Sequence, residues 1–306
     1  MKVKADSRWR RRPRDWQREP PSALLLALEG RAIFEWSALL LAWPWLGRAP
    51  HGDGHPVLVL PGLLASDAST LPIRGLLDRL GFVSHPWELG MNRGPVKGVI
   101  GKLSKRVRDL SKQSGRKVSL VGWSMGGAMA HGLALAMPDR VRSVITMGSP
   151  LDGHPHSTHA WRVFEQVSGL QADDEQLHDL MGLPALVPTT NILSKSDGIV
   201  HWRSSMLPPS ALSETIEVSA SHLGLGVHPA VLWMIAERLA QAEGAWRPFV
   251  RSGPWRSFWF RDPRRLRIDD LYARAQRRVT EAALTRAETT DTGSDRLLKD
   301  HHNDGV

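Results

Sequence analysis

Residues 118–127 read VSLVGWSMGG, and this stretch decides the fold of the chain. Val118 to Val121 is a short apolar run, which is typical of a buried parallel strand. The run leads into the turn Gly122-Trp123-Ser124-Met125-Gly126, and the small residues from Gly127 to Met137 predict a helix. A sharp turn between a strand and a helix exposes the side chain at its centre, so Ser124 is the candidate nucleophile of this sequence.

The two glycines of the turn have a steric explanation. A serine exposed in this way has a strained backbone, and the chain approaches itself closely two residues to either side. Only a small residue fits at those positions, which predicts that Gly122 and Gly126 are required there. The helix after the turn points its first amides at Ser124 and so favours developing negative charge. The alternative is an ordinary glycine-rich turn without chemistry, which the flanking strand and helix make less favourable.

Strand-like and helix-like segments alternate between residues 55 and 242. This alternation predicts an α/β protein, with a mostly parallel sheet and helices on both of its faces. In such a sheet the functional residues lie beyond the carboxyl ends of the strands. Besides 118–121, the predicted strands are 57–60, 141–147, 190–193 and 215–218, and the predicted helices besides 127–137 are 96–112 and 229–242.

An acid that could serve Ser124 follows one of these strands. Asp197 comes shortly after residues 190–193, which predicts a carboxylate on a loop at the rim of the site. It could instead be a turn-forming aspartate before Gly198, because Asp-Gly pairs favour turns in any protein. Asp152 also follows a strand end and is the alternative acid.

The chain has 13 histidines, so position has to decide which of them is the base. Serine chemistry needs an imidazole between the acid and the nucleophile, which takes the serine proton and later gives it to the leaving group. His222 comes directly after the last predicted strand and before the last predicted helix, and we expect it to be that base. His154, His156 and His159 cluster elsewhere, but no carboxylate or thiolate is placed to complete a metal site with them.

Four motifs together resemble the α/β-hydrolase superfamily, and within it the bacterial lipases and esterases. The resemblance implies that Ser124 is the nucleophile, Asp197 the acid and His222 the base, with no cofactor. It also implies an oxyanion hole formed by the amides of Met125 and Leu63. Many relatives have His-Gly where this chain has Pro61-Gly62, which leaves Leu64 as an alternative to Leu63. The motifs are Gly122–Gly126, Pro61-Gly62-Leu63-Leu64, Ser196-Asp197-Gly198-Ile199-Val200 and Ser221-His222-Leu223-Gly224.

Composition divides the chain into four predicted regions. Residues 1–21 form a basic, disordered arm, and residues 22–50 an apolar helical segment that stops near Pro44. Residues 51–243 form the hydrolase domain, and residues 244–306 a basic, aromatic extension. The chain of 306 residues contains no cysteine, which excludes disulfides, thiolate metal sites and a cysteine nucleophile, and fits a reducing compartment.

An insertion at about 153–188 predicts a helical cap on the hydrolase domain. Its apolar residues recur at helical spacing, so the helices either pack on the sheet or line an acyl pocket, or do both. These residues are Trp161, Phe164, Val167 and Leu170, followed by Leu177, Leu180 and Met181. The apolar cap predicts an ester with an apolar acyl chain as the substrate. Acyl transfer or thioester cleavage at the same site, or a catalytically silent lipid-binding protein, are the alternatives.

Positive charge is concentrated in the flanks, at net +5 over residues 1–21 and +6 over residues 246–267. Together with interleaved tryptophans, this favours contact with an anionic membrane over single-stranded nucleic acid. The aromatics could equally seal the hydrolase core. Glu29, Arg31 and Glu35 interrupt the apolar run of residues 23–46, which argues against a signal peptide and a membrane-spanning helix. We therefore expect a cytoplasmic protein with peripheral membrane contact left open; the sequence does not predict an oligomeric state.

Overall fold

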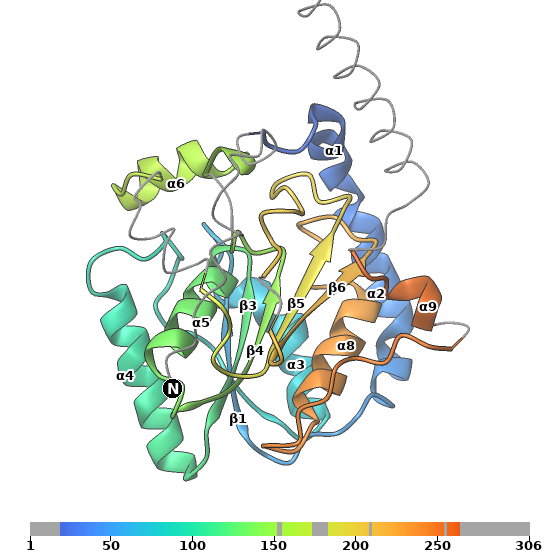
Figure 1. Cartoon of the computed structure of the whole chain (residues 1–306). Helices are drawn as coiled ribbons and strands as arrows, with labels where there is room; N and C mark the ends of the chain where they lie inside the picture. The colour runs from blue at the N-terminus through green and yellow to red at the C-terminus, as the bar shows by residue number, and fades with distance from the viewer. Residues whose placement is uncertain (1–18, 152–154, 173–182, 208–209, 254–255, 264–306) are drawn as a thin grey trace, which may run out of the picture. The chain divides into compact units, whose positions relative to one another are not determined.

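The computed structural model describes residues 19–151, 155–172, 183–207, 210–253 and 256–263. They are built around one sheet of six parallel strands in the order β2-β1-β3-β4-β5-β6, with helices around it (Figure 1). The carboxyl ends of all six strands therefore lie at the same edge of the sheet. The strands are β1 (Pro56–Leu60), β2 (Val83–His85), β3 (Val118–Trp123), β4 (Val141–Met147), β5 (Thr189–Ser194) and β6 (Ser213–Val218).

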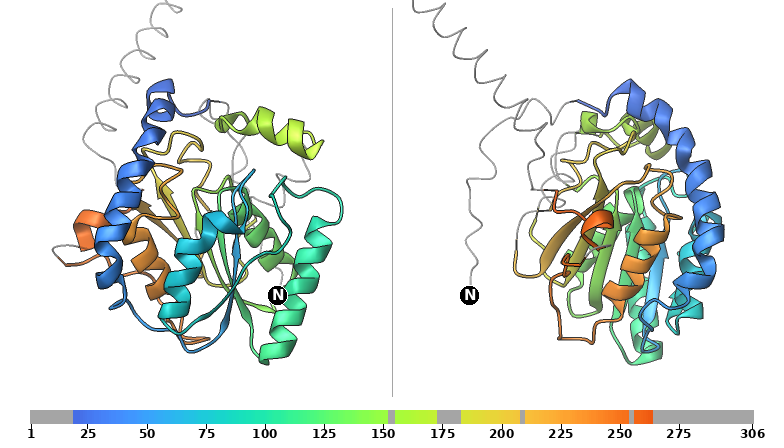
Figure 2. Two further views of the ribbon diagram at one scale, coloured as in Figure 1. Left: turned by 180° about the vertical axis from the view of Figure 1, so that it is seen from behind. Right: turned by 90° about the vertical axis from the view of Figure 1, so that its right-hand side faces the viewer.

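Each face of the sheet carries its own hydrophobic core, because successive side chains of a strand point to opposite faces. Val57 and Val59 of β1 pack with helices α2, α3 and α8, whereas Leu58 and Leu60 pack with α4 and α5. Figure 2 shows these helices covering the two faces. The helices are α2 (Ala32–Leu46), α3 (Leu71–Arg79), α4 (Val99–Ser114), α5 (Met125–Ala136) and α8 (Pro229–Leu239), with a 3-10 turn η4 (Asp67–Thr70) before α3.

The predicted α/β class and parallel sheet are confirmed. Each strand expected from the sequence is present, to within a residue or two at either end. The edge strand β2 and helix α3 are absent from the prediction. β2 has only three residues and none of them is buried, so it lacks the apolar run by which the other strands are identified.

Residues 22–50 form α1 (Ala23–Ala27), the 3-10 turn η3 (Leu28–Arg31) and α2. The sequence predicts that the helix stops near Pro44, and α2 ends two residues beyond it, at Leu46. A proline so close to the end of a helix removes only one backbone hydrogen bond. The last turn is also held from outside, since Leu46 is buried and the Arg79 side chain donates to the carbonyl of Trp43 over 3.0 Å.

Residues 246–253 and 256–261 lie against the domain built around the sheet. The rings of Phe249 and Phe260 are both buried in the core and meet edge to face with their centroids 5.0 Å apart. Arg261 exchanges two backbone hydrogen bonds of 2.8 Å with Glu217 of the edge strand β6. These contacts support the interpretation that aromatics of the C-terminal flank seal the core, and they cover an otherwise open sheet edge. The short helix α9 (Arg256–Trp259) lies in this region.

Contacts between residues place Met1–Asp262 in one compact unit and Pro263–Val306 in another. The second unit, apart from Pro263, lies outside the described residues, as does the predicted arm over residues 1–18. The same holds for Asp152, His154 and the cap residues Leu177, Leu180 and Met181. The division into four regions therefore stays a prediction. Within the described part of the chain, no helix combines the length and the hydropathy needed to cross a membrane.

Candidate active site

Ser124 lies in the turn between the end of β3 and the start of α5. Its backbone has φ 54° and ψ −123°, a left-handed conformation that is strained for a residue with a Cβ atom. The turn is held by a hydrogen bond of 2.8 Å from the Ser124 amide to the carbonyl of Met147 at the end of β4. The predicted sharp turn is therefore present, and Ser124 lies at its centre, where it is half-buried.

The steric prediction for the two glycines is confirmed. A Cβ atom on Gly126 would lie 2.5 Å from the carbonyl oxygens of both Leu60 and Pro61. One on Gly122 would collide with the backbone of Gly127 at the start of α5. Both contacts are with backbone, which cannot move aside as a flexible side chain does. The close packing of β3, α5 and the loop after β1 therefore requires glycine at both positions.

Asp197 and His222 form a buried hydrogen-bonded pair. Asp197 Oδ2 lies 2.6 Å from His222 Nδ1, and the two residues are each 3% exposed. Asp197 Oδ1 accepts from the amides of Ile199 over 2.8 Å and Val200 over 2.7 Å, so Asp197 also forms the turn that its sequence context suggested. A proton on Nδ1 facing Asp197 leaves Nε2 of His222 as the basic nitrogen.

The pair lies next to the Ser124 turn, as three contacts show. The Trp123 indole donates to the His222 carbonyl over 3.1 Å. A Cβ atom on Gly148, which directly follows Met147, would lie 3.0 Å from Asp197 Oδ2 and 3.1 Å from His222 Nδ1. Among the residues that the structure describes, the Ser124 hydroxyl makes no hydrogen bond to His222. Catalytic hydrogen bonds are often long without substrate and tighten only when it binds.

The surroundings of His222 favour its charged form. Burial lowers the pKa of His222, but the charge and hydrogen bond of Asp197 and the charge of Glu29 outweigh that effect, so the pKa is raised above its ordinary value. An imidazole of this kind is a stronger base than one that is buried alone. The pair can therefore accept a proton from a neighbouring hydroxyl and stabilise the resulting imidazolium.

Two backbone amides beside Ser124 remain available for a ligand. A Cβ atom on Gly62 would lie 3.4 Å from Cβ of Ser124, so the loop after β1 lies against the turn. The Leu64 amide already donates to the Asn92 carbonyl over 2.7 Å, which favours Leu63 over Leu64 as a donor. The amides of Leu63 and Met125 have no hydrogen-bond partner among the described residues. Together they can receive a negatively charged oxygen bound next to Ser124.

The N-terminal segment holds the loops that carry Asp197 and His222. The buried Glu29 carboxylate accepts three backbone N–H groups, from Gly198 over 2.7 Å and from His222 and Leu223 over 2.9 Å each. Glu35 accepts both the amide of Ser221, over 2.7 Å, and its hydroxyl. One helical segment thus fixes the backbone on both sides of the Asp197–His222 pair.

Arg31 of the same segment adds two hydrogen bonds, to the carbonyl of Ser196 over 2.7 Å and to its hydroxyl over 2.9 Å. Glycine permits this close approach. A Cβ atom on Gly198 would collide with the backbone of Leu25, and one on Gly224 with the carboxylate of Glu35. Sequence analysis missed this role. The available signal was the presence of charged residues in an otherwise apolar run, which indicates buried polar partners.

The cap prediction is only partly within the described residues. Helix α6 (Trp161–Ser168) follows the 3-10 turn η5 (Pro155–Ser157), and the buried Phe164 ring lies against Gly94. An antiparallel bridge joins Thr158 to Val200, so the insertion is attached to the loop after Asp197. Figures 1 and 2 show α6 and α1 at the end of the sheet to which the strand arrows point. No metal-binding group of three side chains occurs in the part of the chain described.

A second hydrogen-bonded series of Asp, His and Ser side chains lies near the amino ends of the strands, at the end of the sheet opposite Ser124. Asp53 Oδ1 lies 2.6 Å from His55 Nδ1, and His55 Nε2 lies 2.9 Å from the Ser119 hydroxyl. Ser119 is fully buried within β3 and also bonds the hydroxyl of Ser143 over 3.0 Å. Burial lowers the pKa of His55 more than Asp53 raises it. A substrate cannot reach this serine, so we interpret these hydrogen bonds as structural.

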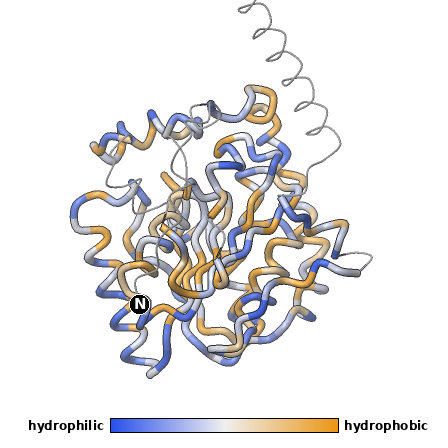
Figure 3. The backbone as a smooth tube through the Cα atoms, viewed as in Figure 1, coloured by the Kyte–Doolittle hydropathy of each residue, from blue (hydrophilic) through white to orange (hydrophobic). Residues whose placement is uncertain are grey.

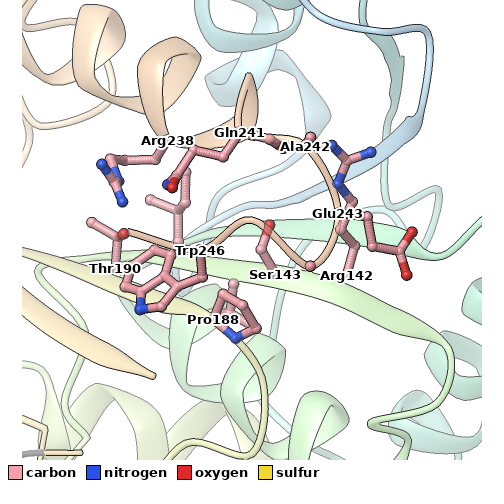
Figure 4. Close-up of a pocket in the computed structure, with 12 residues that line it drawn as sticks. Arg142, Ser143, Pro188, Thr190, Arg238, Gln241, Ala242, Glu243 and Trp246 are labelled. Atoms are coloured by element: carbon pink, nitrogen blue, oxygen red, sulfur yellow. Dashed lines mark hydrogen bonds between the residues drawn. The ribbon is translucent and has the colours of Figure 1, made fainter. Parts of the chain in front are cut away.

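A small pocket also lies away from Ser124. Figure 4 shows it between the first residues of β4 and β5 and the end of α8. The volume of the pocket is about 30 Å³. Arg142, Ser143, Thr190, Arg238 and Trp246 contribute to its wall. A cavity of this volume holds about two water molecules. The pocket is therefore too small for an organic substrate, and it is at the wrong edge of the sheet.

A parallel sheet with a serine in the sharp turn between β3 and α5 is typical of the α/β-hydrolase fold. A sequence profile for the family described as alpha/beta hydrolase fold matches residues 105–171, which include β3, the Ser124 turn, α5 and β4. The chain therefore has the α/β-hydrolase fold that its motifs predict. No curated protein sequence matches the chain.

Several solved structures of lipases are similar to this chain. Lipase B from Aspergillus fumigatus is 18% identical over 64% of this chain, with a TM-score of 0.49, and the match spans 55% of that lipase. A monoacylglycerol lipase from Paleococcus ferrophilus is 15% identical over 61% of this chain and 96% of its own, with a TM-score of 0.46. The lipase BlEst2 from Bacillus licheniformis is 15% identical over 64% of this chain and 95% of its own, also with a TM-score of 0.46.

Proposed function

We propose that the protein is a serine hydrolase that cleaves a carboxylic ester through an acyl-enzyme on Ser124. One observation carries the proposal: Ser124 has a strained backbone with positive φ, and its turn is joined through the Trp123–His222 hydrogen bond to a buried carboxylate–imidazole pair. Strain of this kind persists where the surrounding structure enforces it, and it is concentrated at functional sites. The family match over the same turn supports a hydrolase.

The proposed reaction has two halves, formation of the acyl-enzyme and its hydrolysis by water. Ser124 Oγ attacks the ester carbonyl while His222 Nε2 takes its proton, and Asp197 stabilises the imidazolium. The amides of Met125 and Leu63 receive the oxyanion. The imidazolium then protonates the alcohol as it leaves, and the acyl group stays on Ser124. Water attacks this acyl-enzyme with His222 again as base, which releases the acid and restores the serine.

An apolar acyl group fits the side chains around the site. Leu64, in the loop beside Ser124, is 45% exposed, and Leu223, directly after His222, is 48% exposed. Apolar groups on both sides of the reacting atoms favour burial of a hydrocarbon chain. Acyl transfer and thioester cleavage need the same residues and differ in the acceptor or in the leaving group.

A fluorophosphonate probe tests the proposal, because it phosphonylates an activated serine and releases fluoride. We expect it to label the wild-type protein but not Ser124→Ala. The matched control is Ser119→Ala, which removes the other histidine-bonded serine and leaves labelling intact. A folded wild-type protein that takes no label, or a Ser124→Ala variant labelled as fast as the wild type, would overturn the assignment.

A further inference from the structure

The N-terminal helices α1 and α2 expose an unusual amount of hydrocarbon. Six large apolar side chains, which we call the apolar face, are each at least 65% exposed, and those of α2 recur on the side opposite the buried Leu39 and Leu46. Figure 3 shows hydrophobic residues along α1. A soluble surface rarely carries an apolar patch of this size without a partner. The apolar face consists of Leu24, Ile33, Phe34, Leu40, Leu41 and Trp45.

The charged residues of the same helices point inward. Residues 23–46 contain three of them, Glu29, Arg31 and Glu35, and all three bond the loops beside the Asp197–His222 pair. The exposed Ser37 hydroxyl donates to the carbonyl of Ile33 over 3.1 Å, so its polar group is satisfied within the helix. The outer side of the segment therefore presents hydrocarbon and indole, while its polar groups hold the active-site loops.

We propose that the apolar face binds an anionic lipid surface. Positive charge precedes the segment in the sequence, where residues 1–21 carry eight Lys and Arg against three Asp and Glu. At its other end, the Arg48 guanidinium lies 4.4 Å from the ring centroid of Trp45. Apolar side chains flanked by cations and tryptophan match the boundary between acyl chains and anionic headgroups. A second copy of the chain would bring like charges together, which disfavours self-association through this face.

The placement of the segment sets how the protein meets the lipid. Because the inner side of the helices is bonded to the protein, only the outer side can enter the lipid, and the helices lie along the surface. Leu223, half exposed beside His222, donates its amide to Glu29 and extends hydrocarbon from the segment toward the site. The lipid surface would thus lie next to the rim of the site. This inference goes beyond ester cleavage and does not depend on the reactivity of Ser124.

Flotation of the full chain with vesicles tests the proposal. We expect the chain to float with vesicles of phosphatidylcholine and phosphatidylglycerol, and more weakly with phosphatidylcholine alone or at high salt, where the attraction is screened. Leu41→Glu places a charge on the most exposed residue of the apolar face and should lower the partition coefficient by about tenfold or more. Its matched control is Ile100→Glu, on the exposed side of α4, which should float like the wild type.

The catalytic and lipid-binding proposals fail separately. Ser124→Ala should float like the wild-type protein although it takes no fluorophosphonate, so a loss of labelling does not affect this inference. A wild-type chain that stays with neither vesicle type, or a folded Leu41→Glu variant that floats as well as the wild type, would overturn it. A dimer in sedimentation that Leu41→Glu dissociates, without vesicle binding, would assign the face to a second copy instead.

Discussion

Glu29→Gln is the substitution that tests most directly how the N-terminal segment acts on the site. The carboxylate accepts three backbone N–H groups, whereas the amide of glutamine keeps one acceptor oxygen and directs an NH2 group at an amide donor. Hydrogen bonds to a charged group contribute about 1.5–3 kcal/mol each and neutral ones about 0.5–1.5 kcal/mol. Losing one bond and weakening two should therefore lower the free energy of unfolding by about 3 kcal/mol.

The same substitution should change the pH dependence of activity. The charge of Glu29 is one of the groups that raise the pKa of His222 against the effect of burial, so removing it lowers that pKa. His222 acts as a base only when neutral. A lower pKa leaves it neutral at lower pH, and the acid limb of kcat/KM moves to lower pH. We also expect kcat at the plateau to fall by about tenfold, because the loop carrying His222 is less well fixed.

Glu35→Gln is the matched control for this experiment. It weakens the bonds to Ser221 on the same loop, but Glu35 is not among the groups that shift the pKa of His222. Denaturant unfolding should show that both variants are less stable, whereas p-nitrophenyl ester hydrolysis across pH should show a moved acid limb for Glu29→Gln only. An unmoved limb in Glu29→Gln, or an equal movement in both variants, would refute an electrostatic role for Glu29.

Two further predictions follow from the structure. Burial lowers the pKa of His228 to about 4, so the unfolded chain binds its proton first, and the free energy of unfolding falls by up to about 3 kcal/mol between pH 6.5 and 4. His228→Asn keeps an acceptor at the N-terminus of α8 and should flatten this part of a curve of unfolding free energy against pH. An unchanged slope would contradict the assignment. Gly126→Ala should lower the free energy of unfolding by about 2 kcal/mol or more, because its Cβ would press on the carbonyl oxygens of Leu60 and Pro61. The displaced turn should also abolish fluorophosphonate labelling. A stable, labelled variant would show that the turn can relax.

The central sheet could be predicted from the sequence because its strands are buried on both faces. A strand such as β1 is a continuous apolar run that local periodicity detects without knowledge of its neighbours. β2 could not be found in this way, because its pairing with β1 at the edge of the sheet rests on backbone hydrogen bonds. The Ser124 turn was equally local: the strained serine and its two glycines are required by one another within a few residues.

The hydrogen bond between Asp197 and His222 joins two residues 25 positions apart, and only the order of the strands made it predictable. The bonds from Glu29 span 169 residues or more, and no local pattern specifies them. The sequence nevertheless indicates that this segment has buried polar partners. Three charges interrupt an apolar run, and burial of a carboxylate is unfavourable unless it is paired or hydrogen-bonded. Such charges argue against a membrane-spanning helix, but they equally indicate that one side of the helix must meet polar partners.

The distribution of these charges also distinguishes the two sides of helix α2. In α2 the residues that face the protein include a carboxylate that bonds backbone and side-chain donors, whereas those that face outward are almost all hydrocarbon. A helix packed only for stability would carry polar and charged side chains on its outer side. The inner side of α2 meets the core through Leu39 and Leu46 and the loop before His222 through Glu35, so its partners lie within the protein. The outer side calls for an apolar partner, and the lipid surface that we propose would supply it without placing any of the three charges in hydrocarbon.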